Sequence, residues 1–199
     1  FRSYAEYTGS NGAVFNFVDG TVADPYGGTD HFTGIEGARG TANADDFIGS
    51  TGNEFFRGLA GNDTFNGGGG DDGVRYDKDA QYGGMAGVTV NLALGTATDG
   101  FGDTDTLIGI DRVRGTDQAD TLIGGVGDDT LTGGLGNDVL DGGGGSNTAV
   151  FAGLAASYTV SNAGGTLSVV GADGSDTLTN IQFLQFDEET LGAPVTGPS

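Results

Sequence analysis

The sequence contains no cysteine, no tryptophan, three prolines and one histidine in 199 residues. Without cysteine, neither a disulfide nor a thiolate zinc site can form. Basic residues are also scarce, with seven lysines and arginines against 28 acids and a formal net charge of −21. Nucleic acids and anionic membranes attract basic surfaces, so this balance argues against both and favours cations as partners. No stretch approaches the roughly 18 apolar residues of a membrane span, so membrane insertion is not predicted.

Glycine and aspartate, in contrast, are abundant. There are 42 glycines, and 23 of the 28 acids are aspartate. Aspartate and glycine favour turns and weaken helices, whereas glutamate favours helices. The composition therefore predicts a turn-rich chain with little or no helix. The only histidine, His31, has no nucleophile at a spacing typical of a catalytic family, so we interpret it as a surface residue and predict no enzyme activity.

Nine-residue units of glycine and aspartate occur in two runs. The first run, from Gly40, reads GTANADDFI, GSTGNEFFR, GLAGNDTFN and GGGGDDGVR, and the second, from Gly115, reads GTDQADTLI, GGVGDDTLT, GGLGNDVLD and GGGGSNTAV. The units carry glycine early, an acid at the sixth place and an apolar residue at the eighth. That order alternates a turn with a short buried strand. The eighth-place residues are predicted to form the core: Phe47, Phe56, Phe65, Val74, Leu122, Leu131, Leu140 and Ala149.

A shift of 75 positions aligns the sequence with itself without a gap, and 29 of the 75 aligned residues are identical. The repeat predicts a first module at 1–75 (lead-in 1–39, nonapeptides 40–75) and a second at 76–150 (lead-in 76–114, nonapeptides 115–150). Phe1 aligns with Tyr76 and Phe151, each of which follows a finished run. We therefore expect the chain to be a piece of a longer tandem protein.

Each lead-in begins with a strand pattern, AVFNF in the first module and VTVNL in the second. Residues 151–199 differ from both modules and are predicted to form a C-terminal β capping segment and tail. Within them, YTVSNAGGTLSVVGADG is typical of two strands joined by a turn, and SDTLTNIQFLQF ends in apolar residues where the modules return to glycine. A stack of repeats leaves its last apolar layer open, so a cap is required.

Two nonapeptides complete one coil of turn, strand, turn and strand, so sixth-place residues 18 apart lie above one another at one edge. The predicted pairs are Asp45 with Asp63, Glu54 with Asp72, Asp120 with Asp138, and Asp129 with Asn147. Stacked strands are about 4.7–4.9 Å apart, so one cation can contact both carboxylates of a pair. A shell of carboxylate and carbonyl oxygens suits Ca²⁺ better than Mg²⁺, and zinc or copper would require histidine or cysteine.

The core alone is too small to hold such a chain folded. One buried apolar side chain contributes about 1.5–3 kcal/mol, whereas ordering the backbone costs about 1–2 kcal/mol for each of nine residues. The chain is therefore predicted to fold only when calcium binds. Asn147 is neutral, so the site of its pair is predicted to bind more weakly than the others.

These nonapeptides resemble the RTX (repeats-in-toxin), or hemolysin-type calcium-binding, family, whose repeat is G-G-x-G-x-D-x-U-x. The resemblance covers about 70 residues in eight in-register copies. It implies an all-β fold: a parallel β-roll (right-handed β-solenoid) with two roll segments, short lead-in strands and a C-terminal β cap. It also implies export from a Gram-negative bacterium by type I secretion, a chain unfolded at low cytosolic calcium, and about four to six bound calcium ions.

In that family one turn supplies its sixth-place acid and the carbonyls of its second and fourth residues. The turn 18 residues later supplies its acid and the carbonyls of its first and third residues. For the first turn of each pair, the resemblance implies carbonyl ligands at Thr41 and Asn43, Ser50 and Gly52, Thr116 and Gln118, and Gly125 and Gly127. For the second turn it implies Gly58 and Ala60, Gly67 and Gly69, Gly133 and Leu135, and Gly142 and Gly144.

Acids also occur outside the nonapeptides. Asp30 and Asp105 lie 15 residues before the first sixth-place acid of their module, in a shortened coil, and are candidates for one more calcium site per module. Asp77 and Asp79 are outside the register and are interpreted as solvated surface residues, as isolated acids usually are.

Together these features predict a non-catalytic, calcium-dependent β-roll segment of a larger secreted bacterial protein, located outside the cell or on its surface. Its role would be export-coupled folding, spacing or adhesion, with surface polysaccharide or neighbouring domains of the same chain as further partners. Two alternatives stay open. One is the C-terminal tail of a secreted protease, lipase or polysaccharide-modifying enzyme, which a catalytic constellation in flanking sequence would favour. The other is a carbohydrate-binding module that uses Tyr4, Tyr7, Tyr26 or Phe101.

Overall fold

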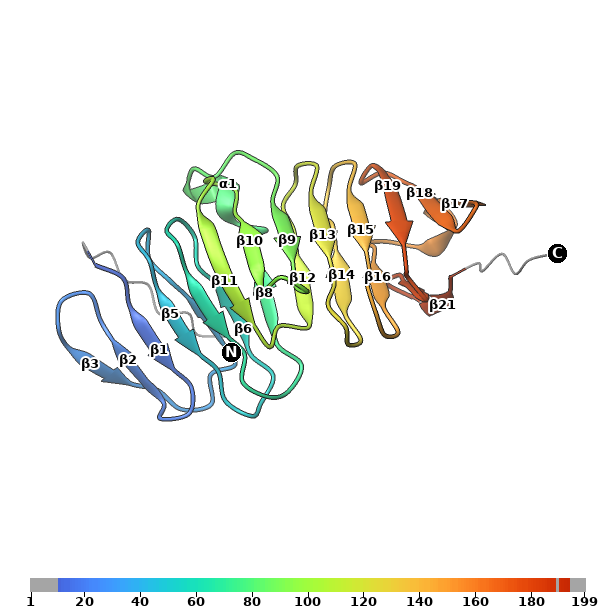
Figure 1. Ribbon diagram of the computed structural model, residues 1–199. Coiled ribbons are helices and arrows are strands. Elements are labelled where there is room, and N and C mark those ends of the chain that lie inside the picture. The colour runs from blue at the N-terminus through green and yellow to red at the C-terminus, as the bar shows by residue number, and fades with distance from the viewer. Residues whose placement is uncertain (1–10, 189, 194–199) are drawn as a thin grey trace.

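The structure, a computed structural model, describes residues 11–188 and 190–193. Its strands form two sheets that run along an elongated stack (Figure 1). The thirteen-stranded sheet, called sheet A, and the eight-stranded sheet, called sheet B, enclose one apolar core. Neighbouring strands of the nonapeptide regions are parallel, which confirms the predicted all-β parallel β-roll.

The strands are short and are numbered in chain order. Sheet A contains β1 (Val14–Asn16), β2 (Thr21–Ala23), β3 (Thr29–His31), β5 (Asp46–Ile48), β7 (Thr64–Asn66), β9 (Thr89–Asn91), β10 (Thr96–Thr98), β11 (Thr104–Ile108), β13 (Thr121–Ile123), β15 (Val139–Asp141), β17 (Thr159–Ala163), β18 (Thr166–Val170) and β19 (Ser175–Thr179). Sheet B contains β4 (Gly37–Arg39), β6 (Phe55–Arg57), β8 (Gly73–Arg75), β12 (Arg112–Arg114), β14 (Thr130–Thr132), β16 (Thr148–Val150), β20 (Phe183–Gln185) and β21 (Thr190–Gly192).

Successive nonapeptide strands alternate between the two sheets, because each glycine-rich turn redirects the chain. In sheet A, Phe47 pairs with Phe65, and Leu122 pairs with Leu140. These residues occupy the middle of three-residue strands and are buried, whereas the residues that flank them are exposed or half-buried. The paired residues are 18 positions apart, as predicted, so one coil consists of two nonapeptides.

An antiparallel insertion interrupts sheet A at the start of each module. Strands β1, β2 and β3 form one meander, and β9, β10 and β11 form its equivalent in the second module. Strand β11 then pairs in parallel with β7 of the first module, with Leu107 opposite Phe65, and β12 pairs with β8, with Val113 opposite Val74. The second module therefore continues the stack of the first.

A single turn of α-helix, α1 (Asp79–Tyr82), precedes β9, and a 3₁₀ turn, η1 (Ala155–Ser157), precedes β17. These two short turns make up the helix of the described residues, in line with the little helix that the composition predicted. Helix α1 ends at Gly83, whose φ of 110° is a left-handed conformation that glycine adopts readily. Neither turn in this part of the chain has the length and apolar character to cross a membrane.

The last strands close the stack. Strands β19 and β20 add to β15 and β16 in parallel, after which β18 and β17 extend sheet A as an antiparallel hairpin. The rings of Phe151, Tyr158 and Phe186 pack together beside them, with centroids 5.2–5.6 Å apart. These elements cover the last apolar layer of the roll. The division of the chain into two modules and a cap stays a prediction.

Candidate metal centres

The sixth-place residues lie at one edge of each sheet, immediately before the strands. Those before β5, β7, β13 and β15 line the edge of sheet A, and those before β6, β8, β14 and β16 line the edge of sheet B. Each is at most 5% exposed: Asp45, Asp63, Asp120 and Asp138 at sheet A, and Glu54, Asp72, Asp129 and Asn147 at sheet B. Burying a charged carboxylate is costly unless hydrogen bonds or a cation compensate the charge.

Every predicted pair is in direct contact. The backbone N–H of the first member donates to one side-chain oxygen of the second member. The four bonds are 2.7–2.9 Å long and join Asp45 to Asp63, Glu54 to Asp72, Asp120 to Asp138, and Asp129 to Asn147. The stacking that the 18-residue spacing predicted is therefore present, and it uses Oδ1 of each second member.

In the first turn of a pair, the acid is held by its own turn. The N–H of Thr41 donates to Oδ2 of Asp45 at 2.7 Å, and the Thr41 hydroxyl is 3.2 Å from both carboxylate oxygens. Thr116 makes the same backbone bond to Asp120 at 2.7 Å, with its hydroxyl 2.9 Å from Oδ1. The sequence predicted only carbonyl roles for these threonines. A hydroxyl residue at the second place of the unit is the signal for this additional contact.

In the second turn of a pair, the acid keeps an unsatisfied oxygen. Oδ2 of Asp63, of Asp72 and of Asp138 is buried without a hydrogen-bond partner. The second residue of these turns is left-handed, with φ of 76° at Leu59 and 117° at Gly134, and the backbone bond found in the first turns is missing. Buried polar atoms are nearly always satisfied, so three of the four pairs present an oxygen that a cation would satisfy.

This unsatisfied oxygen lies over the first glycine of its own turn. A Cβ on Gly58 would stand 1.7 Å from Oδ2 of Asp63, and a Cβ on Gly133 would stand 2.0 Å from Oδ2 of Asp138. Any side chain at these two places would therefore displace the carboxylate. The first glycine of the unit is required for space between the turn and its acid.

The predicted carbonyl ligands lie between stacked turns. The carbonyl oxygen of each first-place glycine lies close to the first-place glycine one coil earlier. A Cβ built on that earlier glycine would be only 2.0–2.8 Å from the oxygen, for the pairs Gly40 and Gly58, Gly49 and Gly67, Gly115 and Gly133, and Gly124 and Gly142. Each fourth-place carbonyl group is equally close to a glycine one coil later. A Cβ built on that later glycine would be 2.0–2.8 Å from the carbonyl group, for the pairs Asn43 and Gly61, Gly52 and Gly70, Gln118 and Gly136, and Gly127 and Gly145. Second-place carbonyls of Ser50 and Gly125 accept the third-place N–H of Gly69 and Gly144 at 2.9 Å. Of the remaining third-place residues, Ala60 is half-buried and Leu135 is exposed, and calcium ligation by this set stays a prediction.

The fourth pair is built differently. Asn147 replaces the acid, and its Nδ2 donates to the carbonyl oxygens of Gly144 at 2.8 Å and Asn180 at 3.0 Å. The amide group therefore satisfies two carbonyl oxygens with its own hydrogens, which a carboxylate cannot do. This arrangement supports the prediction that the Asp129–Asn147 site binds calcium more weakly.

Asp30 and Asp105 do not stack on the acids of their own modules, which corrects the shortened coil predicted from the sequence. Strand β2 lies between β3, which carries Asp30, and β1, and β10 separates β11, which carries Asp105, from β9 in the same way. Asp105 instead accepts the N–H of Asp63 on Oδ1 and the hydroxyl of Tyr76 on Oδ2, both at 3.0 Å. It therefore extends the edge of the first module, whereas Asp30 is exposed.

Three residues outside the nonapeptides extend the two edges in the same way and were missed. Asp111, Asp176 and Gln182 accept the backbone N–H of Asp72, Asp138 and Asn147, respectively, at 2.6–3.2 Å. The signal for Asp176 was the likeness of SDTLTNIQFLQF to TDTLIGIDRVRG, which places Asp176 at the position of Asp105.

Burial is the main cause that raises the pKa of the second-turn acids. It brings the pKa of Asp63 to about 9, of Asp138 to about 7 and of Asp72 to about 6, although a backbone hydrogen bond lowers each value. Neighbouring carboxylates raise the pKa further, and for Asp63 they include Asp105 and Asp45. Without a cation, these acids therefore bind protons more strongly than acids in water.

Within the described chain, no three acidic or histidine side chains are grouped so as to hold a metal ion by themselves. The donors come as pairs of side chains together with backbone carbonyls. Calcium takes six to eight oxygen ligands of this kind. The unsatisfied oxygens of Asp63, Asp72 and Asp138 fit such an ion, whereas the amide of Asn147 fits it less well.

Arginines of sheet B gather around Asp77. Arg57 contacts Asp77 at 2.7 Å, and Arg75 and Arg114 lie 3.4 Å and 3.6 Å from the other oxygen of Asp77. Burial acts to raise the pKa of Asp77, but these arginines, first of all Arg57, lower it below its usual value. The side chain of Asp77 is only 13% exposed, so its interpretation as a solvated surface residue was wrong.

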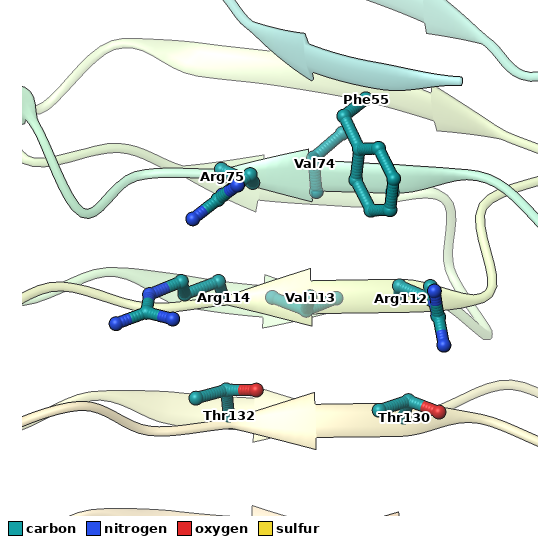
Figure 2. A pocket seen from close by; sticks show the side chains of 9 residues that line it. Phe55, Val74, Arg75, Arg112, Val113, Arg114, Thr130 and Thr132 are labelled. Carbon is teal, nitrogen blue, oxygen red and sulfur yellow. The ribbon is translucent and has the colours of Figure 1, made fainter. Parts of the chain in front are cut away.

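A hollow lies beside these arginines, and Phe55, Gly73 and Val113 also line it. Figure 2 shows Arg75 and Arg114 at one end of it and Arg112 at the other, near Phe55. Arg112 contacts Asp71 at 3.2 Å and lies over the ring of Phe55, with the guanidinium carbon 5.9 Å from the ring centroid. Guanidinium groups beside an aromatic ring can bind an anionic group, such as a carboxylate.

Comparisons with known proteins agree with the repeats. Among curated proteins, none matches this sequence. The crystal structure of the extracellular lipase LipA from Serratia marcescens is similar at 17% identity over 75% of this chain, with a TM-score of 0.19, and the chain spans 38% of the lipase. At that TM-score the likeness carries no weight. The model of the RTX calcium-binding nonapeptide repeat, in contrast, matches four copies at residues 39–77 and 114–149. Residues 39–77 and 114–149 of this chain are therefore RTX calcium-binding nonapeptide repeats.

Proposed function

We propose that this chain is a calcium-binding β-roll segment of a larger secreted bacterial protein, and that it folds when it meets calcium outside the cell. The observation that carries the proposal is the buried, unsatisfied Oδ2 of Asp63, Asp72 and Asp138. The other oxygen of each carboxylate accepts the backbone N–H of the stacked first-turn residue, and no base is paired with Oδ2 among the described contacts. Type I secretion and a role in adhesion or spacing are part of the proposal.

The residues of one site have distinct tasks. Thr41 holds Asp45 through its N–H and hydroxyl, so the first carboxylate has a defined position. Asp63 is fixed through Oδ1 by the N–H of Asp45, which leaves Oδ2 over Gly58 for a ligand. A bound calcium ion would supply the positive charge that offsets the two buried carboxylates. Without that charge the stacked acids repel, so the roll is expected to unfold.

A calcium titration tests the proposal. Far-UV circular dichroism of the chain in EGTA is expected to show an unfolded chain, and millimolar calcium should produce a β spectrum, because extracellular sites of this kind bind at about 10⁻⁴–10⁻³ M. Magnesium at the same concentration is the control and should leave the chain unfolded. A β spectrum that persists in EGTA would contradict folding on calcium.

The arginine-lined hollow supports a second candidate function, binding of an anionic glycan. The sequence predicted this role for aromatic residues, of which Tyr26 is 70% exposed, Phe101 is half-buried, and Tyr4 and Tyr7 lie outside the described residues. A carboxylated polysaccharide would use guanidinium contacts instead. Binding to alginate and to a neutral glucan, measured with R112Q and with Y26A, separates the two surfaces. Loss of alginate binding in R112Q alone is expected, and loss in Y26A alone would contradict it.

A further inference from the structure

The edge of sheet A that carries the sixth-place acids continues past the antiparallel strands β9, β10 and β11 of the second module. Strand β10 runs opposite to its neighbours, with Thr98 opposite Thr104 of β11 on one side and Thr89 of β9 on the other. Its carboxyl end therefore lies at the edge where the parallel strands begin. Asp99 directly follows β10, so it lies on this edge although it does not belong to a nonapeptide turn.

Asp99 has the same unsatisfied oxygen as the second-turn acids. The residue is 1% exposed. Its Oδ1 accepts the N–H of Phe101 at 2.9 Å and of Asp103 at 2.8 Å, which closes the loop after β10. Its Oδ2 is buried without a hydrogen-bond partner. A buried carboxylate with one oxygen free is costly unless a cation lies against it.

A second acid reaches this loop from α1. Asp79 is also 1% exposed, and its Oδ2 accepts the N–H of Gly100 at 3.2 Å. A Cβ on Gly100 would stand 3.0 Å from Cβ of Asp79 and 3.2 Å from the carbonyl oxygen of Ala86. Burial raises the pKa of Asp79 to about 7, and the charge of Asp99 adds to this rise. Asp79 was interpreted from sequence as a solvated surface residue, and its burial shows that this was wrong.

We propose that Asp79 and Asp99 hold a further divalent cation, of the calcium class, outside the nonapeptide turns and next to the contact between the two modules. Backbone carbonyls such as that of Ala86 complete its oxygen shell. The site rests on the proposed function in one respect, that the chain binds calcium. It neighbours Asp105, which carries the bond to Asp63 of the first module, so its ion strengthens the joint between β11 and β7.

The first module contains an equivalent loop. Asp24 is the equivalent of Asp99, and its Oδ1 accepts the N–H of Tyr26 at 2.7 Å and of Gly28 at 2.9 Å. Asp24 is only half-buried, and the position equivalent to Asp79 in the sequence is Tyr4. Asp24 therefore provides a matched control for Asp99.

Native mass spectrometry of the calcium-loaded chain tests the site. D79N and D99N keep the oxygen that accepts the backbone bonds but remove the charge, and each is expected to bind one calcium ion fewer than the unaltered chain. D24N and the outward-facing D46N are controls and should keep the full number. A number unchanged in both D79N and D99N would overturn this site alone, whereas an unaltered chain that binds no calcium would contradict the proposed function.

A measurement on the unaltered chain covers the case in which a variant fails to fold. Crystals grown with terbium, a calcium substitute with strong anomalous scattering, should show a peak about 2.3–2.6 Å from Oδ2 of Asp99. Peaks at the nonapeptide turns without one at Asp99 would overturn the proposal.

Discussion

The two modules build the same coil with different interiors. In the first module Phe15, Phe47 and Phe65 stack across β1, β5 and β7, with ring centroids 4.8 Å and 4.9 Å apart. In the second module the equivalent strands place Val90, Leu122 and Leu140 in register. The backbone pairing is the same in both, so the 18-residue register does not depend on the shape of the core side chains. It depends on the turns, which are common to both modules.

The modules also differ in their acids. The first has two pairs with an unsatisfied carboxylate oxygen, at Asp63 and Asp72, and the second has one, at Asp138, because Asn147 satisfies its own surroundings. The first module therefore combines the larger aromatic core with the larger number of nonapeptide pairs that present an unsatisfied carboxylate oxygen. Four predictions follow from this contrast, beginning with the largest effect.

Truncation of the core should cost more in the first module. F47A is expected to lower the free energy of unfolding by about 3–5 kcal/mol, since it removes the ring that stacks between Phe15 and Phe65, and L122A should cost less, within about 2–5 kcal/mol. Urea unfolding in saturating calcium measures both, with I48A, on the outer face, as the control. A larger cost for L122A than for F47A would contradict the contrast between the cores.

Filling the space under a second-turn acid should destabilise the roll. G133A would place a Cβ 2.0 Å from Oδ2 of Asp138, and it is expected to cost about 1–3 kcal/mol by overpacking. Gly127, which has no atom within 4 Å of its Cβ position, is the matched control, and G127A should change stability by less than about 0.5 kcal/mol. Thermal unfolding in calcium distinguishes the two. Equal melting temperatures would argue against a carboxylate placed over the first glycine.

Replacing the amide of Asn147 by an acid should make its pair bind calcium like the others, and replacing the acid of Asp138 by an amide should have the opposite effect. N147D is expected to add one bound calcium ion and D138N to remove one, as counted by native mass spectrometry. At calcium ten times above the dissociation constant, each ion contributes about 1.4 kcal/mol to the free energy of unfolding. The outcome that would sink this prediction is a number of ions that stays the same in N147D.

Calcium affinity should depend on pH, and differently in the two modules. The pKa of Asp63 is raised to about 9 and that of Asp138 to about 7, chiefly by burial. A raised pKa means that protonation stabilises the calcium-free fold at low pH, and this contribution is lost as pH rises through the folded pKa. Calcium must displace the proton, so affinity should fall as pH drops below about 9 at the site of Asp63 and below about 7 at the site of Asp138. Titrations of D138N and D63N at pH 6 to 9 measure each separately.

Much of this arrangement was predictable because it is periodic. Glycine and aspartate at nine-residue spacing predicted the turns, the central buried residue of each strand and the contact of Asp45 with Asp63. These features are local: each turn has the same composition, so each adopts the same conformation and advances the chain by the same step.

The places where the period breaks were not predictable in the same way. The lead-ins fold as antiparallel meanders, which moves Asp105 away from Asp120 and places it next to Asp63, 42 residues earlier in the chain. Asp77 and Asp79 have no signal of their own in the sequence, and Asp77 is half-buried and Asp79 buried because elements distant in the chain pack against them.

The repeating composition is sufficient to specify the coil, its core and its need for cations, because these depend on neighbours one coil apart. Which acids outside the repeat become buried, and which of their oxygens are left without a hydrogen bond, is decided only when α1 and the meanders dock onto the stack. That docking depends on packing between segments tens of residues apart, which no local pattern encodes.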